Sequence, residues 1–428
     1  MDIELTEELH RIGERARSAS RILGLASSDE KNRALLAMAN QLLEDAPGIL
    51  AANALDLAAG EQAGLSDSML DRLRLDRVRL ESMAEGIRVA ASLPDPVGIT
   101  LTEWKKENGL DFQKISVPIG VIGIIYESRP NVTSDAAILC LKAGNAVILR
   151  GGSEAIHSNR AIASSLQVGT CRAGLPEASI QLVQVTDREA VRLLCGMEKH
   201  LDCIIPRGGK GLIETVSLHA RMPVIKHYDG ICSVYVDAGA DLEMARSILL
   251  NAKCQRPGVC NAIETLLLNR AIAPTFLSEG ILSLLERGVE LRCDKESLGL
   301  IPESIMVEHA SLLKEAVEED FRTEFLSLIL ALRIVGSVDE AIDHIESHGS
   351  HHSDSIVTED AKVAERFLRG VDSATVYWNA STRFTDGSEF GFGCEIGIST
   401  DKLHARGPMG LQELTSYKYL IRGSGQVR

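Results

Sequence analysis

The pattern of hydrophobic positions divides the first half of the chain into three stretches. From residue 3 to 95, apolar residues recur at three- and four-residue spacing, which predicts a run of helices. Between 99 and 117, two alternating segments flank Asn108-Gly109, a pair that predicts the turn of a β-hairpin. After Pro118, apolar strands such as GVIGIIYE and NAVILR alternate with helical segments. Strands that are apolar throughout predict a parallel sheet covered on both faces.

The alternation of strand and helix restarts after residue 230. DLEMARSILLNAK predicts a helix, CNAIETLLLN a strand, and ELRC, SIMVE and LILALRIVG further strands. A chain of 428 residues is long enough for two domains, and we predict two α/β domains with parallel-rich sheets. The first comprises residues 1–98 and 118–230, and the second 231–405. The hairpin at 99–117 and the extended tail at 406–428 lie outside both.

Composition and charge narrow the classes of partner. The net charge is −15 and aromatic residues make up 4%, which disfavours a nucleic-acid partner. The longest apolar run, FLSLILAL, is too short to cross a membrane, and the acidic N-terminus is unlike a signal peptide. The nine cysteines form neither a CxxC pair nor a zinc-type cluster. We therefore expect a cytoplasmic protein with reduced thiols, no metal and no membrane partner.

Two predicted strands end in glycine-rich loops. The first is Arg150-Gly151-Gly152-Ser153, and the second is Arg207-Gly208-Gly209-Lys210-Gly211. Backbone N–H groups at such strand–helix junctions suit the phosphates of a dinucleotide. Neither loop has the GxGxxG or the GxxxxGK[ST] spacing. Ordinary strand-to-helix turns are the alternative interpretation.

Cys260 stands at the junction of a loop and a predicted strand, in QRPGVCNAIETLL. The Arg-Pro-Gly before it excludes the middle of a helix. A thiol becomes a nucleophile when nearby donors or positive charge lower its pKa. The alternative is a small packing residue, the usual role of a single cysteine.

Several long motifs resemble one known family. They are QRPGVCNAIETLL, RPNVTSD, NAVILRGG, IPRGGKGL and ASTRFTDGSEFGFGCEIGIST. They are similar to the gamma-glutamyl phosphate reductases, an acyl-phosphate branch of the aldehyde dehydrogenase superfamily that acts in proline biosynthesis. The resemblance covers nearly the whole chain. It implies an aldehyde dehydrogenase-like fold, with a cofactor-binding first domain, a catalytic second domain and an oligomerisation arm formed by the hairpin and the tail.

The resemblance also implies roles for individual residues. Cys260 matches the nucleophile, and the side-chain amide of Asn131 matches an oxyanion donor beside the Cys260 N–H. Residues matched to cofactor binding are Arg150, Gly151, Ser153, Gly208, Gly209 and Glu324. Residues matched to substrate binding are Arg129, Ser381, Thr382, Arg383 and Arg406. Each has an alternative: Asn131 as a helix cap, Glu324 as a solvated charge, the arginines as surface salt bridges.

The implied reaction is the NADPH-dependent reduction of L-glutamyl 5-phosphate to L-glutamate 5-semialdehyde and phosphate, through a thioester on Cys260. Ser153 stands where NAD-specific relatives tend to carry a glutamate, which favours NADPH with Arg150 at the 2′-phosphate, although Glu154 is adjacent. VIKHYDGICSV lacks the glutamate that activates water in hydrolytic relatives. Lys226, His227 and Tyr228 in that stretch receive no role.

The resemblance implies partners as well. We expect a homo-oligomer formed through the arm, and an association with the glutamate 5-kinase that makes the substrate, although no docking motif is visible. Two other functions compete. One is an acylating or hydrolytic aldehyde dehydrogenase for another small aldehyde. The other is a catalytically silent oligomer that keeps the fold.

Overall fold

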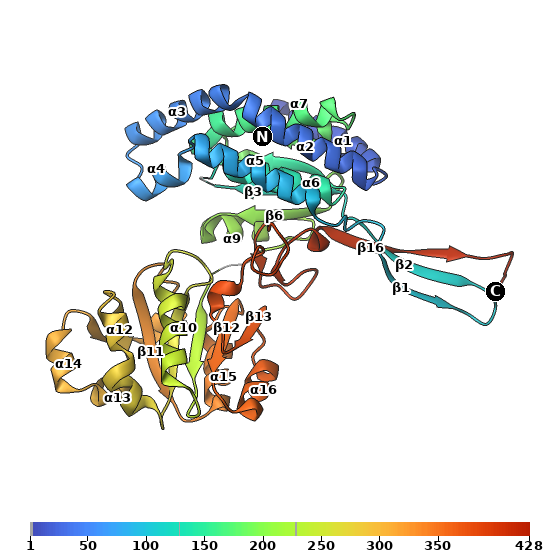
Figure 1. The fold of residues 1–428 in the computed structure, drawn as a ribbon. Helices are drawn as coiled ribbons and strands as arrows, with labels where there is room; N and C mark the ends of the chain where they lie inside the picture. The colour runs from blue at the N-terminus through green and yellow to red at the C-terminus, as the bar shows by residue number, and fades with distance from the viewer. Residues whose placement is uncertain (1–2, 128, 227–228) are drawn as a thin grey trace. The chain divides into compact units, whose positions relative to one another are not determined.

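The structure is a computed structural model that describes residues 3–127, 129–226 and 229–428. The chain forms two compact units. Unit 1 comprises Met1–Lys226, Gly391–Gly397 and Pro408–Arg428, and unit 2 comprises His227–Phe390 and Ile398–Gly407. Figure 1 follows the chain through both. The short strands β14 (Ile398–Ser399) and β15 (Gly407–Pro408) pair with each other.

Unit 1 is built on a four-stranded parallel sheet in the order β5-β4-β3-β6. Its strands are β3 (Val121–Tyr126), β4 (Ala146–Arg150), β5 (Ile180–Leu182) and β6 (Cys203–Arg207). Its helices are α1 (Ile3–Leu23), α2 (Ser28–Glu44), α3 (Ala46–Gln62), α4 (Asp67–Leu73), α5 (Arg77–Ser92), α6 (Asn131–Lys142), α7 (Ile156–Arg172), α8 (Glu189–Cys195) and α9 (Lys210–His219). Every residue of β3 and β4 is buried, as expected for a sheet covered on both faces.

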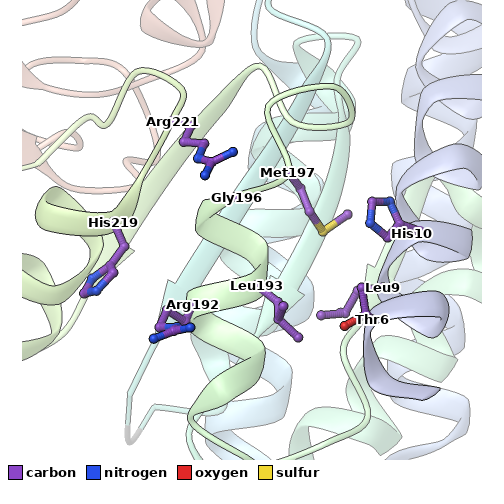
Figure 2. A pocket seen from close by; sticks show the side chains of 9 residues that line it. All are labelled: Thr6, Leu9, His10, Arg192, Leu193, Gly196, Met197, His219 and Arg221. Carbon is purple, nitrogen blue, oxygen red and sulfur yellow. The ribbon is translucent and has the colours of Figure 1, made fainter. Parts of the chain in front are cut away.

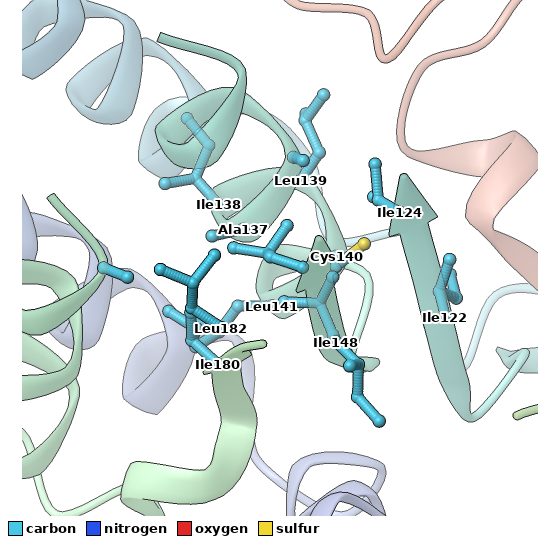
Figure 3. Close-up of a cluster of buried hydrophobic side chains, with 14 of the residues drawn as sticks. Ile122, Ile124, Ala137, Ile138, Leu139, Cys140, Leu141, Ile148, Ile180 and Leu182 are labelled. Carbon is cyan, nitrogen blue, oxygen red and sulfur yellow. The ribbon is translucent and has the colours of Figure 1, made fainter. Parts of the chain in front are cut away.

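The core of unit 1 forms between this sheet and α6. Ile122, Ile124 and Ile148 of the strands and the run Ala137–Leu141 of α6 are all excluded from solvent (Figure 3). The second half of α6 is therefore buried on every side, as in a helix enclosed within a domain. Gly144 ends it with a φ of +76°, a conformation that glycine adopts without steric cost.

A three-stranded antiparallel sheet extends from unit 1 (Figure 1). The strands β1 (Thr100–Lys105) and β2 (Asp111–Pro118) form a hairpin, and β16 (Thr415–Arg422) pairs with β2. The turn of the hairpin contains Gly109 at a φ of +86°. Trp104 stacks on Phe112 with ring centroids 5.1 Å apart, although all of β1 is exposed. We call this sheet the arm.

Unit 2 contains a seven-stranded parallel sheet in the order β10-β9-β11-β8-β7-β12-β13. The strands are β7 (Cys232–Val236), β8 (Ile263–Asn269), β9 (Glu290–Cys293), β10 (Leu313–Glu315), β11 (Ile329–Val335), β12 (Ser353–Val357) and β13 (Thr375–Trp378). The helices are α10 (Leu242–Cys254), α11 (Ala273–Thr275), α12 (Leu282–Leu285), α13 (Lys295–Leu300), α14 (Glu303–Glu308), α15 (Val338–His348) and α16 (Ala361–Gly370). Because all the strands run the same way, their amino ends meet at one edge, which we call the amino edge.

One predicted strand is wrong. SIMVE lies within the helix α14, which follows Pro302 and has Glu303 in its first turn. Proline and an acidic residue both favour the beginning of a helix. A run of five residues with three apolar positions fits a strand and a helix equally well, so its period could not decide between them.

Among the described residues, no helix combines the length and the apolar content that a bilayer-spanning segment needs.

Packing around α6 leads to a stability prediction. Leu141 is fully buried in α6, whereas Leu218 on α9 is 80% exposed. We expect Leu141→Ala to lower the free energy of unfolding of unit 1 by about 3 kcal/mol, because it removes buried methyl groups and leaves a cavity. The matched change Leu218→Ala should alter it by less than about 0.5 kcal/mol. Urea denaturation followed by far-UV circular dichroism measures both, and equal effects would contradict the assigned core.

Candidate active site

Cys260 lies at the amino edge of the sheet of unit 2, in a turn three residues before β8. Strand β8 stands between β7 and β11. Gly230 precedes β7, and Glu324 and Leu326 precede β11. The parallel arrangement therefore brings the segments that lead into three neighbouring strands to the predicted nucleophile.

The backbones of Gly230 and Cys260 are in unusually close contact. A Cβ atom added to Gly230 would lie 2.5 Å from the Cα of Cys260 and closer still to its carbonyl oxygen. Real Cβ atoms do not approach backbone atoms so closely, and backbone cannot swing aside as a side chain can. Only glycine is therefore compatible with this position of the Cys260 turn.

Glu324 holds Gly230 in place. Its Oε1 accepts a hydrogen bond of 2.9 Å from the Gly230 N–H. Burial raises the pKa of this carboxyl group, and the bond from Gly230 offsets part of that effect. The solvated charge considered as an alternative for Glu324 is therefore not what the structure contains. One carboxylate oxygen is engaged with the protein, and cofactor binding by Glu324 stays a prediction.

A fully buried ion pair joins the two ends of the loop that carries Cys260. Lys253 Nζ lies 2.5 Å from Glu264 Oε2, and neither side chain is exposed to solvent. Lys253 also donates to the carbonyl of Ile263 at 2.8 Å, and Glu264 Oε1 accepts from the Leu326 N–H at 3.2 Å. Burial raises the pKa of Glu264 to about 7 and lowers that of Lys253.

A second cysteine supports the backbone of the first. The thiol of Cys232 donates a hydrogen bond of 3.2 Å to the carbonyl of Cys260, and its sulfur lies 3.5 Å from His352 Nδ1. Burial raises the pKa of Cys232 well above its usual range. Cys232 is thus a protonated donor that helps to fix the turn.

The predicted segment Ser381-Thr382-Arg383 reaches the same loop. Thr382 Oγ1 donates to the carbonyl of Asn261 at 2.7 Å, and Arg383 binds Asn261 Oδ1 and, at 3.0 Å, Gln255 Oε1. Ser381 Oγ accepts from the Arg383 N–H at 3.2 Å. The charge of Arg383 is close enough to Cys260 for the two groups to interact. The structure therefore brings these three residues to the loop that carries Cys260, the predicted nucleophile.

Arg406 occupies a different part of the amino edge. It forms an ion pair of 2.6 Å with Asp372, which Lys402 also contacts, and these cations lower the pKa of Asp372 to about 2. Asp372 precedes β13, which stands three strands from β8. At about 4.8 Å per strand, that is roughly 14 Å from the Cys260 strand. Arg406 is thus held by a carboxylate away from the other predicted substrate residues of unit 2.

In unit 1 the glycine-rich loops lie at the carboxyl ends of β4 and β6. The Gly209 N–H, at the N-terminus of α9, donates 2.9 Å to a carboxylate oxygen of Glu127. A Cβ on Gly208 would collide with the same carboxylate, and one on Gly151 would collide with Asn159. A carboxylate therefore occupies the kind of helix N-terminus at which the phosphates of a dinucleotide bind.

A cleft of about 560 Å³ opens beside the first glycine-rich loop. It lies at the carboxyl end of a parallel sheet, where α/β domains bind dinucleotides. Its size and its mixture of apolar and polar groups fit a nucleoside. The lining residues are Asp56, Ala59, Gly60, Ala63, Leu65, Met69, Glu127, Ser153, Glu154, Ile156 and His157.

Arg150 ends β4 with its side chain almost fully buried. Its Nη2 donates to the carbonyls of Thr186 at 2.9 Å and Asp187 at 3.2 Å. Burial lowers the pKa of this guanidinium, whereas the nearby Glu154 raises it. The guanidinium thus ties the end of β4 to the loop after β5, and a role at a 2′-phosphate stays a prediction.

Asn131 is the first residue of α6, and the N-cap position belongs to Pro130, so Asn131 is not the helix cap considered as an alternative. Its side-chain N–H donates 2.8 Å to Asp135 one turn later, and burial raises the pKa of Asp135 to about 6. Arg129 lies two residues before α6. His227 and Tyr228, to which the sequence assigned no role, lie outside the described residues.

A further pocket of about 310 Å³ borders α1, α8 and α9 (Figure 2). Arg192 lies in the last turn of α8, where positive charge complements the helix dipole, and His219 lies in the last turn of α9. Arg192 and Arg221 also face Glu189 and Glu198, at 3.5 Å and 3.8 Å. These cations are accounted for by the fold, and we assign no ligand to the pocket.

Within the part of the chain that the structure describes, no group of three or more His, Cys, Asp or Glu side chains is arranged to hold a metal ion.

Sequence reasoning missed several residues of the site: Gly230, Cys232, Lys253, Glu264 and Asp135. Asp135 had a signal, since it stands four residues after Asn131 in a predicted helix and so shares its face. Lys253 and Glu264 had none, because a lysine in a helix and a glutamate in a strand are ordinarily exposed. Their pairing depends on how α10 and β8 pack.

Comparisons with known proteins identify the family of the chain. A model of the aldehyde dehydrogenase family matches residues 5–287. Gamma-glutamyl phosphate reductase of Moorella thermoacetica is 54% identical, over 98% of this chain and 99% of the relative. That of Paramagnetospirillum magneticum is 51% identical, over 97% of this chain and 96% of the relative. The crystal structure of gamma-glutamyl phosphate reductase from Thermotoga maritima is 43% identical, with a TM-score of 0.95, and covers 98% of this chain and 100% of its own.

More distant structures share the fold alone. An acetylating aldehyde dehydrogenase from Geobacillus thermoglucosidasius is 20% identical with a TM-score of 0.69, covering 100% of this chain and 99% of its own. The two parallel α/β sheets are those of an aldehyde dehydrogenase, a class of oxidoreductases. The family model and the near relatives place the chain more narrowly: it belongs to the gamma-glutamyl phosphate reductases. This membership confirms the resemblance, the fold class and the enzyme class predicted from the sequence.

The contact between Gly230 and Cys260 leads to a catalytic prediction. We expect Gly230→Ala to lower kcat about 100-fold, because the added methyl group displaces the Cys260 turn and small misplacements of catalytic groups have effects of that size. Gly239→Ala is the matched control, since a Cβ there would meet its nearest atom, Thr358 Oγ1, at an ordinary 3.5 Å. Steady-state kinetics on both variants tests this, and a fully active Gly230→Ala enzyme would contradict the described contact.

Proposed function

We propose that Cys260 is the nucleophile with which this chain, an NADPH-dependent oxidoreductase of proline biosynthesis, reduces L-glutamyl 5-phosphate to L-glutamate 5-semialdehyde and phosphate. The observation that carries the proposal is the setting of Cys260: a half-exposed thiol in a turn fixed by Gly230 and Cys232 and approached by Arg383. Burial is the largest cause of a raised pKa in each of the other eight thiols: Cys140, Cys171, Cys195, Cys203, Cys232, Cys254, Cys293 and Cys394.

The first chemical step is acyl transfer to sulfur. The Cys260 thiolate attacks the γ-carbonyl carbon, the bond from that carbon to the phosphate oxygen breaks, and phosphate leaves with the electron pair. The Cys260 N–H and the Asn131 amide hold the transient oxyanion, each donor contributing on the order of 3 kcal/mol in comparable acyl-transfer sites. The product on the enzyme is a γ-glutamyl thioester, and the covalent intermediate divides one difficult step into two easier ones.

The second step is reduction of the thioester. NADPH, when bound, supplies the hydride that the thioester carbonyl carbon receives. The same two donors stabilise the resulting thiohemiacetal oxyanion, which then expels the Cys260 thiolate and releases the aldehyde. Because VIKHYDGICSV carries no glutamate, the segment before β7 offers no carboxylate of the kind that activates water in hydrolytic relatives. The thioester thus persists until reduction.

The substrate carries a phosphate, a carboxylate and an ammonium group. Arg383 binds one of the two anions, assisted by the hydroxyl groups of Ser381 and Thr382, because a planar guanidinium suits both phosphate and carboxylate. Its contacts to Asn261 and Gln255 orient it beside Cys260. Arg129 and Arg406 are the remaining anion-binding candidates, and Arg406 would have to exchange Asp372 for the substrate.

The cofactor fits the carboxyl edge of the sheet of unit 1. The N–H groups of the loop at Gly208 and Gly209 would hold the pyrophosphate in place of the Glu127 carboxylate. Gly151 would permit close approach of the cofactor to the backbone, Ser153 would leave space at the ribose, and Arg150 would be the cation for a 2′-phosphate. Glu324 would hold the nicotinamide ribose through the carboxylate oxygen that does not bind Gly230.

The alternative enzyme function, an acylating or hydrolytic aldehyde dehydrogenase for another aldehyde, is not favoured. Relatives named gamma-glutamyl phosphate reductase reach 54% identity over nearly the whole chain, whereas the acetylating aldehyde dehydrogenase reaches 20%. A silent oligomer is disfavoured by the same relatives and by a cysteine turn that glycine alone permits.

The arm supports a homo-oligomer. Leu101 and Trp104 of β1 and Tyr417, Tyr419 and Ile421 of β16 are 39–56% exposed, and an exposed apolar sheet of this kind is typical of a surface that another chain covers. We therefore propose that copies of this chain pair through the arm in the cytoplasm. The kinase that produces the labile acyl phosphate remains a proposed partner without a defined surface.

The central test of the function is removal of the thiol. We expect Cys260→Ala to lower kcat at least ~1,000-fold, because no other group can form the thioester. In the wild type, iodoacetamide should label Cys260 first, since its thiol is the proposed nucleophile, and substrate or NADPH should change the rate. Peptide mass spectrometry follows the labelling. Full activity of Cys260→Ala, or equal labelling of all nine thiols, would refute the proposal.

Assembly through the arm can be tested separately. We expect Trp104→Glu to reduce the mass measured by light scattering at micromolar concentration, because a charge is placed in the exposed apolar sheet. Leu25→Glu, at a residue that is 89% exposed outside the arm, is the control and should leave the mass unchanged. A wild-type monomer, or a Trp104→Glu variant of undiminished mass, would contradict assembly through the arm.

A further inference from the structure

We propose that the buried ion pair of Lys253 and Glu264 is a positioning element for Cys260, acting on both ends of its loop and through the segment that carries Glu324. The inference deepens the proposed function and rests on it. Neither residue contacts the reacting atoms in this account. Their role is to fix the distance between the turn that carries Cys260 and the backbone of Gly230.

The first part of the argument is the location of the pair. Lys253 is in the last turn of α10, and Glu264 is the second residue of β8. They bracket residues 254–263, which include the turn with Cys260. The pair at 2.5 Å and the bond from Lys253 to the Ile263 carbonyl at 2.8 Å thus close the base of this loop.

The second part is a chain of contacts that returns to Cys260 from the other side. The Glu264 oxygen that does not contact Lys253, Oε1, accepts a hydrogen bond of 3.2 Å from the Leu326 N–H. Leu326 has a φ of +53°, a left-handed conformation that a leucine keeps only when its surroundings impose it. Two residues earlier, Glu324 binds the Gly230 N–H, and Gly230 presses against the Cys260 backbone. Both sides of the turn that carries Cys260 are thereby linked to the Glu264 carboxylate.

The third part is energetic. Removing two charges from water costs about as much as their attraction returns, so a buried ion pair is often no more stabilising than apolar groups of the same volume. Stability alone therefore does not account for a pair with no solvent exposure. Fixed geometry does, since catalysis by a nucleophile is sensitive to displacements of about 1 Å.

Two double variants separate geometry from stability. Lys253→Met/Glu264→Gln removes both charges and keeps an amide oxygen that can accept from Leu326. Lys253→Met/Glu264→Met removes both charges and that acceptor. The matched control is Arg270→Met/Glu296→Gln, an exposed pair at 2.7 Å that involves the residue just after the opposite end of β8.

Three quantities are measured: kcat per folded active site, KM, and the rate at which iodoacetamide alkylates Cys260 as a function of pH. We expect the Met/Met variant to lose about 100-fold in kcat with KM changed less than about threefold, and to show a displaced pH profile of labelling. The Met/Gln variant should recover at least about tenfold of that loss, and the control pair should match the wild type. Wild-type kcat and labelling in Met/Met, or equal losses in both double variants, would overturn the proposal.

Folding of the variants is checked by the cooperativity and midpoint of thermal unfolding. Leu326→Gly provides a second test that keeps the ion pair, because glycine adopts a φ of +53° without the constraint that the leucine imposes. A loosened segment should lower kcat at least about fivefold. It should also displace the pH profile of Cys260 labelling in the direction seen for Lys253→Met/Glu264→Met, and an unchanged kcat would contradict the link through Leu326. Failure of the proposed function itself is distinguishable, because Cys260→Ala would then remain active.

Discussion

The site depends on one steric constraint, the contact between the backbones of Gly230 and Cys260. No side chain fits on Gly230. The segment before β7 and the turn before β8 are therefore in direct backbone contact. Glu324 holds the first segment through the Gly230 N–H, and Cys232 holds the second through the Cys260 carbonyl. The backbone of Cys260, the predicted nucleophile, is thereby fixed by its contacts with Gly230 and Cys232.

The two units use opposite edges of their sheets. In unit 1 the glycine-rich loops and the cleft beside Ser153 lie at the carboxyl ends of the strands, the usual place for a dinucleotide. In unit 2 Cys260, Glu324 and the segment before β13 gather at the amino edge. Both arrangements follow from parallel strands, because the amino ends of all strands lie at one edge of the sheet and the carboxyl ends at the other. Residues far apart in sequence become neighbours without long connecting loops.

Much of this could be predicted from the sequence. Continuous apolar runs indicated the parallel sheets, Asn108-Gly109 the hairpin, and the long motif around Cys260 the family. The contacts that set the geometry could not be predicted. Lys253 and Glu264 have the appearance of surface residues until α10 packs on β8, and Gly230 resembles any loop glycine until the Cys260 turn lies against it. SIMVE fits a strand as well as a helix, because five residues are too few to reveal a period.

The account stands on a covalent bond to one sulfur atom, and trapping that bond tests it most directly. Incubating the enzyme with L-glutamate 5-semialdehyde and NADP⁺ in the absence of phosphate should leave the γ-glutamyl thioester without its acceptor. Acid quenching, digestion and mass spectrometry should then show a γ-glutamyl adduct on the peptide that contains Cys260. An adduct on any other residue, or NADPH formation in a single turnover without an adduct, would contradict the account.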